Sequence, residues 1–407
     1  MESSYEKFRS VRFFGFLDGL RALSIVAVIW LHSGWETPYY PQVEAMPVLH
    51  QGFYGVQVFF VVSGFLITTL LLREMDRYGR ISLRDFYIRR ALRIGPLYYA
   101  VLALYVVNAL VVERGTVRAA SFLHYLPSFA TFTCTRFISA NWPGGTFNLA
   151  WTLSTEEQFY FFWPIVLRFL RGIWSSVLLI GIIALKLATD HHLTDRVLPP
   201  GWLPTRIVVS IAIPICLGVL LAQALHRERG FRLFYRVLGW KWSAPLMLIA
   251  MLACLAPASP PWLVVFLITT ALIGACVVRE DNGLAWLLQL KPVAFVGTVS
   301  YGMYLLNSFC VHGVRAVLQR FGLAYPPVIF VLTLVVTVTV AYLSHRYYES
   351  WFLALKERFS RLRPVPAQQS RVEIGARDVS APMHPYFHSE PVRKTKLFAA
   401  ARHRVIA

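Results

Sequence analysis

An arginine and a histidine lie inside one long apolar run, residues 13–34, where the hydrocarbon of a membrane tolerates neither side chain well. Arg21 and His32 are eleven residues apart, which is three helical turns plus about 20°, so both project from one face, roughly 16 Å apart along the axis. Asp18 lies within about 40° of that face. Charged groups in a membrane-spanning helix usually face a bundle interior or a wet cavity. This face is therefore a candidate active site.

Each of these residues also has an ordinary explanation. Arg21 is within two turns of the expected cytoplasmic end of the helix, so its guanidinium could extend to the inner headgroups. His32 could be an interfacial side chain at the outer end. The run could also be a cleaved signal peptide, but no small-residue cleavage site follows it and further hydrophobic spans do.

Composition indicates an all-α, polytopic integral membrane protein. Of 407 residues, 57% are hydrophobic and 15% are charged, and the apolar residues come in runs near twenty rather than in amphipathic stripes. We expect a helical bundle of about ten transmembrane helices with both termini in the cytoplasm. The predicted ranges are 16–34, 53–72, 94–112, 151–170, 173–189, 205–225, 243–257, 262–278, 293–314 and 326–348.

The net charge of +19 could indicate a nucleic-acid partner, so the positions of the forty Lys and Arg residues decide the matter. With the N-terminus inside, 31 of them fall in cytoplasmic segments and 7 in outer loops. This bias is the positive-inside signal of a multi-pass protein, here of the cell inner membrane. Topology and anionic lipid explain the basic charge, and we expect no nucleic-acid partner.

The sequence predicts no metal centre and no bound cofactor. Its five cysteines are an odd number, and they show neither a disulfide framework nor zinc-ligand spacing. Residues 1–363 are expected to form the transmembrane domain. Residues 364–407 are polar, basic and proline-containing, and are expected to form a disordered cytoplasmic tail.

A basic cluster precedes the third predicted span. Arg89, Arg90 and Arg93 are spaced so that, on a helix, their guanidinium groups point the same way and could clamp a phosphate or a carboxylate. Any basic cytoplasmic loop would look similar, so they could instead be positive-inside anchors. Pro96 fits the first turn of the helix that follows.

Two adjacent glutamates lie at the outer end of the fourth predicted span. Ser154 and Glu157 have capping-box spacing, which gives Glu157 an ordinary role at a helix start. Glu156 has no such local explanation, and it could face the bundle near the level of His32. The alternative for Glu156 is a solvated acid favoured by the helix dipole.

Other polar residues could support a site. Ser63 and Gly64 interrupt the second span, where small residues more often let neighbouring helices approach. Tyr304 and Asn307 lie one turn apart in the ninth span, which also contains Tyr301. Interhelical hydrogen bonding is the default interpretation of these side chains.

Five fragments occur in the order LDGLRALSIVAVIWLH, GVQVFFVVSGFLIT, RRALRIGP, WTLSTEEQFYFFWP and VSYGMYLLN. Together they resemble the signature segments of the acyltransferase family 3 membrane proteins, over residues 13 to about 350. The resemblance implies a membrane O-acyltransferase that moves an acyl group, usually acetyl from cytoplasmic acetyl-CoA, to a hydroxyl of an envelope or exported saccharide. The chain is similar to a stand-alone member without a fused esterase-like domain.

The same resemblance implies roles for individual residues. Arg21 and His32, with ten residues between them, correspond to a pair regarded as essential in that family. Arg90 and Arg93 correspond to its arginine pair before the third helix, and Glu156 matches the glutamate of its W-x-L-x-x-E segment.

One position departs from the family pattern. Many members have a histidine after the SY-x-x-Y-L segment, and this chain has Asn307 there. Because an amide cannot take up a proton as a neutral imidazole can, we do not expect acid–base chemistry at this position.

The hypothesis that follows is acyl transfer across the bilayer. Arg90 and Arg93 hold the phosphates of the donor at the cytoplasmic face, and the long arm of the donor runs past Arg21 toward His32. His32 takes the proton of the acceptor hydroxyl, or is itself acylated and passes the group on. Glu156 orients the imidazole or stabilises its charged form.

Two other functional classes compete. A transporter or flippase of envelope polysaccharide or lipid-linked intermediates could also have ten helices and buried charges, but it would move an unmodified substrate without acyl-CoA. A non-catalytic membrane partner or sensor would use Arg21 and His32 as a structural pair. Their separation of about 16 Å along one helix disfavours direct contact.

Overall fold

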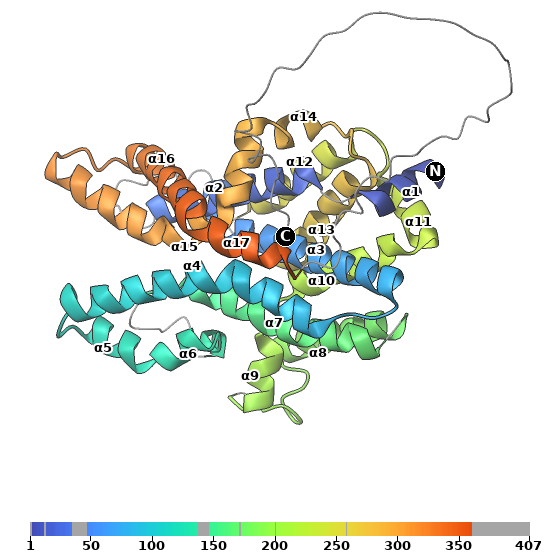
Figure 1. Ribbon diagram of the computed structural model, residues 1–407, viewed down its shortest axis with the longest axis horizontal. Coiled ribbons are helices and arrows are strands. Elements are labelled where there is room, and N and C mark those ends of the chain that lie inside the picture. Colours follow the sequence, from blue (N-terminus) through green and yellow to red (C-terminus); the bar gives the residue numbers. More distant parts are fainter. Residues whose placement is uncertain are drawn as a thin grey trace, which may run out of the picture.

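The computed structural model describes residues 2–11, 14–34, 47–136, 146–170, 172–199, 201–257 and 259–359, and every regular element within these ranges is a helix. The helices pack into a bundle, with the short helices α5 (Val117–His124), α6 (Leu126–Ala130) and α9 (Leu203–Val209) at its lower edge in Figure 1. The all-α prediction is therefore confirmed. The predicted tail 364–407 lies outside the described residues.

Five helices are long and apolar enough to cross a membrane. They are α2 (Gly15–Gly34), α3 (Tyr54–Tyr78), α4 (Leu83–Val111), α15 (Lys291–Arg320) and α16 (Pro326–Ser344), the last of which continues through η3 (His345–Glu349) into α17 (Ser350–Glu357). The number rises to seven if each of two bent pairs is one span. In these pairs α9 precedes α10 (Ile213–His226) with a bend of 59°, and α11 (Glu228–Leu238) precedes α12 (Ser243–Leu255) with a bend of 74°.

A helix occupies each of the ten predicted ranges. The helices not yet given are α1 (Glu2–Ser10), η1 (Pro47–Phe53), η2 (Cys134–Arg136), α7 (Ala150–Phe169), α8 (Trp174–Asp190), α13 (Trp262–Val278) and α14 (Ala285–Leu288). Helix α4 begins well before its predicted range, because the Ser82 hydroxyl caps it by accepting a hydrogen bond from the Asp85 N–H. The prediction that Pro96 lies in the first turn is therefore wrong, and the basic cluster lies inside the helix.

Small residues let the central helices touch. At Gly64 the backbone of α3 meets the Ile215 carbonyl of α10, and at Gly297 the backbone of α15 meets the Asp18 carbonyl of α2. A Cβ at either glycine would collide with backbone atoms that cannot move aside. Close approach at small residues is typical of helices that associate in lipid. The packing interpretation is thus confirmed for Gly64.

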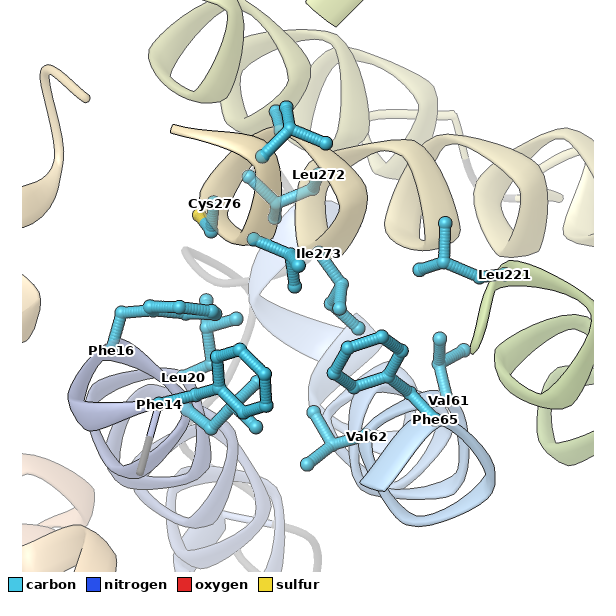
Figure 2. Packing of buried hydrophobic residues seen from close by; sticks show 14 of the residues in the cluster. Phe14, Phe16, Leu20, Val61, Val62, Phe65, Leu221, Leu272, Ile273 and Cys276 are labelled. Carbon is cyan, nitrogen blue, oxygen red and sulfur yellow. The ribbon is translucent and has the colours of Figure 1, made fainter. Parts of the chain in front are cut away.

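A buried hydrophobic cluster holds the first half of α2 against its neighbours. Figure 2 shows Phe14 and Phe16 beside Phe65 of α3 and below Ile273 of α13. The rings of Phe14 and Phe65 meet edge to face, with centroids 5.6 Å apart. Since lipid tails are as apolar as these side chains, the cluster stabilises the bundle through close packing more than through release of water. It fixes the rotation of α2, and hence the direction in which Arg21 points.

Helix α1 lies at the end of the bundle where several long helices finish. Arg9 binds Asp76 near the end of α3 at 2.6 Å, and Asp76 is also 3.0 Å from His226, the last residue of α10. Lys7 pairs with Glu280, just after α13, at 2.9 Å. The ends of α3, α10 and α13 therefore share one side of the bundle with α1.

Candidate active site

Helices α2, α3, α4, α7 and α15 line a small pocket with a volume of about 100 Å³, whose walls mix apolar and polar side chains. Its polar lining comprises Arg21 from α2, Ser63 from α3, Arg90 and Arg93 from α4, Thr152, Glu156 and Tyr160 from α7, and Thr298, Ser300, Tyr301 and Tyr304 from α15. Seven of these residues are candidates from the sequence. Three guanidinium groups and a single carboxylate give the lining an excess of positive charge, which suits an anionic ligand.

Arg90 is held on two sides inside this pocket. Its Nε lies 3.4 Å from the Glu157 Oε1, and its guanidinium carbon lies 3.6 Å from the centre of the Tyr160 ring. An ion pair and a cation–π contact both gain strength where water is excluded. Arg90 is therefore fixed in orientation before any ligand arrives.

Arg93 has no such fixed partner. Among the described residues it makes no hydrogen bond or ion pair, and it is half-buried with its guanidinium in the pocket lining. Arg21 is only loosely paired, since its Nη1 lies 3.7 Å from the Asp18 Oδ1. Because a desolvated cation is costly, Arg93 is the group in this pocket whose free energy a bound anion would lower most.

Glu156 belongs to the same pocket. Its side chain lines the pocket together with Ser63, Arg21, Arg90 and Arg93. This shared lining places Glu156 near the arginines, on the face of α7 that also carries Thr152 and Tyr160.

The two tyrosines of α15 are anchored by their hydroxyl groups. Tyr301 donates to the Ile94 carbonyl of α4 at 2.8 Å, and the Tyr304 hydroxyl lies 2.7 Å from the Thr152 hydroxyl of α7. Interhelical hydrogen bonding is thus what the structure shows for both, and each also lines the pocket. The tyrosines fix α15 relative to α4 and α7, which positions the next turn of α15.

His32 is hydrogen-bonded to that next turn. Its Nδ1 lies 2.8 Å from the Oδ1 of Asn307, and Asn307 is fully buried. The Nδ2 of Asn307 donates to the Tyr304 carbonyl at 2.5 Å, which fixes the direction of the amide. Because an amide oxygen can only accept, Nδ1 of His32 must carry the proton. Nε2 is then the unprotonated nitrogen, available as a base or nucleophile on a half-buried ring.

The structure corrects the expected neighbourhood of His32. Among the described residues, the side chain hydrogen-bonded to the imidazole is that of Asn307. Glu156 lines the arginine pocket, and among the described residues no bond from it to His32 is found. Asn307, which the sequence left without acid–base chemistry, is instead the side chain that holds the imidazole.

The prediction that all three arginines of the basic cluster share one face is wrong for Arg89. Its Nη2 lies 3.2 Å from the Glu74 Oε2, and its Nη1 donates to the Phe359 carbonyl at 2.9 Å. Glu74 is 2% exposed and also accepts from the Ser82 N–H at 2.8 Å. Arg89 and Arg90 are consecutive, so they point about 100° apart, and only one can face the pocket.

Arg89 is accordingly expected to support the fold and not the donor site. Replacing Arg89 by Met leaves the buried Glu74 carboxylate without its cation, which should destabilise the protein by about 1–3 kcal/mol. The thermal unfolding midpoint of the detergent-solubilised protein should fall, while donor affinity of the folded fraction stays unchanged. Arg84→Met, at an exposed position of the same helix, is the matched control. A weakened donor affinity at unchanged stability would contradict this assignment.

Four polar residues of the pocket lining, Thr152, Tyr160, Thr298 and Ser300, were not candidates from the sequence, and neither was Glu157, which pairs with Arg90 outside the lining. Ser154 is the fifth residue of α7, not its cap, so the capping-box prediction is wrong and Glu157 pairs with Arg90 instead. Tyr160 is 2% exposed, and its hydroxyl has no hydrogen-bond partner within the described chain. Tyr160 lies four residues after Glu156 and three after Glu157, and this helical spacing is the signal in the sequence that could have pointed to it.

Comparison with known proteins identifies the family of this chain. The chain belongs to acyltransferase family 3, because the model of that family, described as an acyltransferase domain, matches residues 14–346. No solved structure is significantly similar to the chain.

Several curated relatives are similar over most of this chain. It is 30% identical over 368 residues to YrhL of Bacillus subtilis, which carries the provisional name of a peptidoglycan O-acetyltransferase, covering 85% of this chain and 56% of the relative. It is 29% identical over 310 residues to the peptidoglycan O-acetyltransferase OatA of Listeria monocytogenes, covering 71% and 48%. It is 25% identical over 373 residues to the O-acetyltransferase OatA of Staphylococcus aureus, covering 85% and 58%. The chain thus spans about half the length of these relatives.

Proposed function

We propose that this chain is a membrane O-acetyltransferase that moves an acetyl group from cytoplasmic acetyl-CoA to a hydroxyl of a cell-envelope saccharide. Membership of the family supports acyl transfer. The names of its relatives, two of which specify peptidoglycan, support acetyl as the group and a cell-wall saccharide as the acceptor. One observation carries the proposal. His32 is hydrogen-bonded to Asn307, which lies one helical turn beyond Tyr304 at the edge of the arginine pocket.

The proposed topology has ten membrane spans in the cell inner membrane, with both termini in the cytoplasm. The 31 to 7 distribution of basic residues supports it. So do the contacts of α1 with the ends of α3, α10 and α13, which that distribution assigns to the cytoplasmic side. The bond from Arg89 to the Phe359 carbonyl ties the chain after α17 to the first turns of α4, on the same side.

The donor would enter from that side and place an anionic group in the arginine pocket. Arg93 and Arg21 are the cations without a close ion pair, whereas Arg90 is already neutralised by Glu157. A volume of about 100 Å³ admits one end of acyl-CoA and not the whole carrier. Glu156 would then act by positioning the arginines around that end.

Helix α15 leads from the pocket to the base. Tyr301 and Tyr304 line the pocket and Asn307 binds His32, at intervals of three residues or about 4.5 Å of rise. A thioester that extends from the pocket past Tyr304 would therefore come within one helical turn of the imidazole.

The chemistry follows from the state of the imidazole. Nε2 of His32 accepts the proton of the acceptor hydroxyl while the hydroxyl oxygen bonds to the thioester carbon. The carbon–sulfur bond then breaks, and the imidazolium returns the proton to the departing thiolate. The products are an O-acetyl ester and free coenzyme A. In the covalent variant, Nε2 attacks the thioester first and the acceptor oxygen attacks the resulting acyl-imidazole.

The proposal is tested by mass spectrometry of envelope and exported polysaccharides from cells with and without the gene. We expect a polysaccharide to lose an acetyl mass when the gene is absent, and to regain it when the intact gene is restored. If no polymer, lipid or exported product loses an acyl group, the proposal is wrong.

Replacing Arg93 by Gln should weaken the binding of acetyl-CoA as its main effect. Losing a charge-assisted hydrogen bond to a phosphate or carboxylate costs about 1.5–3 kcal/mol, which is roughly tenfold to a hundredfold in the dissociation constant for acetyl-CoA. The measurement is equilibrium binding to purified protein in nanodiscs. Arg84→Gln, with the same change at an exposed position of α4, should bind as the unaltered protein does. Equal binding by both variants would remove Arg93 from the donor site.

A further inference from the structure

A second, larger cleft adjoins the arginine pocket and has a volume of about 710 Å³. Its walls come from α3, α7, α8, α9 and α13 and from the chain leading into α10. The size falls within the roughly 300–1,000 Å³ of small-molecule sites, well above what an acetyl group needs. None of the chemistry described so far uses this cleft.

The cleft and the arginine pocket share a wall. Phe60 of α3 lines both. On α7, Trp151 and Thr155 line the cleft, whereas the residues that follow each of them, Thr152 and Glu156, line the pocket. A ligand in the cleft would therefore lie one side chain away from the donor site.

Aromatic rings form two sides of the cleft. Trp262 and Phe266 are one turn apart on α13, with ring centroids 5.5 Å apart. Trp151 and Phe60 meet at 6.2 Å on another wall. Flat aromatic faces pack well against the C–H face of a sugar ring, which gives binding area without demanding a charged ligand.

Polar groups are spaced between these rings. Gln57 is 6% exposed, and within the described chain its amide has no hydrogen-bond partner. Because this amide lines the cleft, it can both donate to and accept from a ligand rich in hydroxyl or amide groups. Lys186 and Asp190 form an ion pair at 2.9 Å at the α8 edge, and both have further hydrogen-bonding capacity.

The cleft also lies at the end of the bundle away from the side assigned to the cytoplasm, as an acceptor site requires. Gln57 is 19 residues before Asp76 on α3, which corresponds to about 28 Å along the helix. Asp76 contacts α1 on the side assigned to the cytoplasm. The cleft is therefore on the side where an envelope saccharide would be met.

From these observations we infer that this cleft binds the acceptor, which is an N-acylated or neutral oligosaccharide. Its sugar rings stack between the two aromatic walls, and Gln57 forms a hydrogen bond with a hydroxyl or amide group of the sugar. The inference rests on the proposed function for the identity of the acceptor. It assigns the specificity of the enzyme to residues outside the arginine pocket.

The test is binding of ¹³C-labelled chitotetraose, a soluble chain of N-acetylglucosamine, to the full chain in nanodiscs, followed by NMR. We expect Trp262→Ala and Gln57→Leu each to raise the dissociation constant at least about fivefold, as truncation of an anchoring contact does. Trp286→Ala removes a tryptophan that is 70% exposed elsewhere and should leave binding unchanged.

Acetyl-CoA binding and acetyl transfer, measured on the same samples, separate the two proposals. Saccharide binding that is lost in the cleft variants, with no acetyl transfer by the unaltered protein to any acceptor, overturns the proposed function alone. No saccharide binding by the unaltered protein, or equal binding by Trp262→Ala, overturns the acceptor cleft whether or not transfer occurs. If the cleft variants lose only co-purified phospholipid and bind the saccharide as before, the cleft is a lipid site. That result would also overturn the acceptor cleft.

Discussion

Replacing His32 by Ala is expected to lower acetyl transfer by at least about 10³-fold while acetyl-CoA still binds. The reason is that the imidazole supplies the base or nucleophile, and a positioned proton acceptor contributes about 10²–10⁴-fold. The arginines of the donor site are distant from His32, since Arg21 lies three helical turns from it on α2, and no residue of the pocket lining takes part in the bond between His32 and Asn307. The measurement is single-turnover transfer from labelled acetyl-CoA by purified protein.

His312→Ala is the matched control for this variant. His312 of α15 is exposed, and the hydrogen bond found for it among the described residues is local, to the Ser308 carbonyl at 2.6 Å. Its removal should leave transfer within about threefold of the unaltered protein. Transfer by His32→Ala at more than a tenth of the original rate would show that another group performs the chemistry.

Replacing Asn307 by Leu is expected to give the second largest effect, a fall of about 10²-fold in kcat with the KM for acetyl-CoA unchanged. Leucine is similar in size but cannot accept the Nδ1 proton, so the imidazole loses both its orientation and its preferred tautomer. The proton would then spend most of its time on Nε2, where it blocks the reaction. Asn307 is a positioning residue in this account, since it touches His32 and not the substrate.

The tautomer itself distinguishes this role from a structural one. Nitrogen-15 NMR of histidine-labelled protein should show Nδ1 of His32 protonated in the unaltered chain, with the signal assigned by its loss in His32→Ala. In Asn307→Leu the signal should move to that of an Nε2-protonated ring. Gln319→Leu, the same kind of change at an exposed position of α15, should alter neither the signal nor the rate. An Nε2-protonated ring in the unaltered protein would refute the proposed arrangement.

Much of the site could be predicted because the membrane makes polar residues conspicuous. Arg21, Ser63 and Glu156 each interrupt an apolar run, and polar groups in such runs are usually turned toward one another. That reasoning identifies which residues gather, and the structure brings Arg21, Ser63, Glu156 and the arginine pair into one pocket. The fold class follows from the same pattern, because only helices satisfy every backbone group locally within lipid.

The pairing of these residues could not be predicted, because it depends on contacts between helices. Helical periodicity predicts a place at the donor site for both Arg89 and Arg90. Arg89 does not line the pocket, because its guanidinium pairs with Glu74 of α3. The role of Asn307 depends on its neighbour on another helix. Its amide does not titrate, but through the bond to His32 it sets which ring nitrogen of the imidazole carries the proton. Hydropathy likewise placed the start of α4 too late, because the amphipathic first turns of this helix carry the arginines.

The most direct test of the central claim is transfer by the purified chain in sealed proteoliposomes. Acetyl-CoA labelled in the acetyl group is supplied on the side that carries α1, whose orientation is established by protease access, and a peptidoglycan saccharide is supplied on the other. We predict label on a saccharide hydroxyl, release of free coenzyme A, and neither product when His32 is replaced by Ala. Saccharide that crosses the membrane unlabelled, or label that appears equally with His32→Ala, would contradict the account.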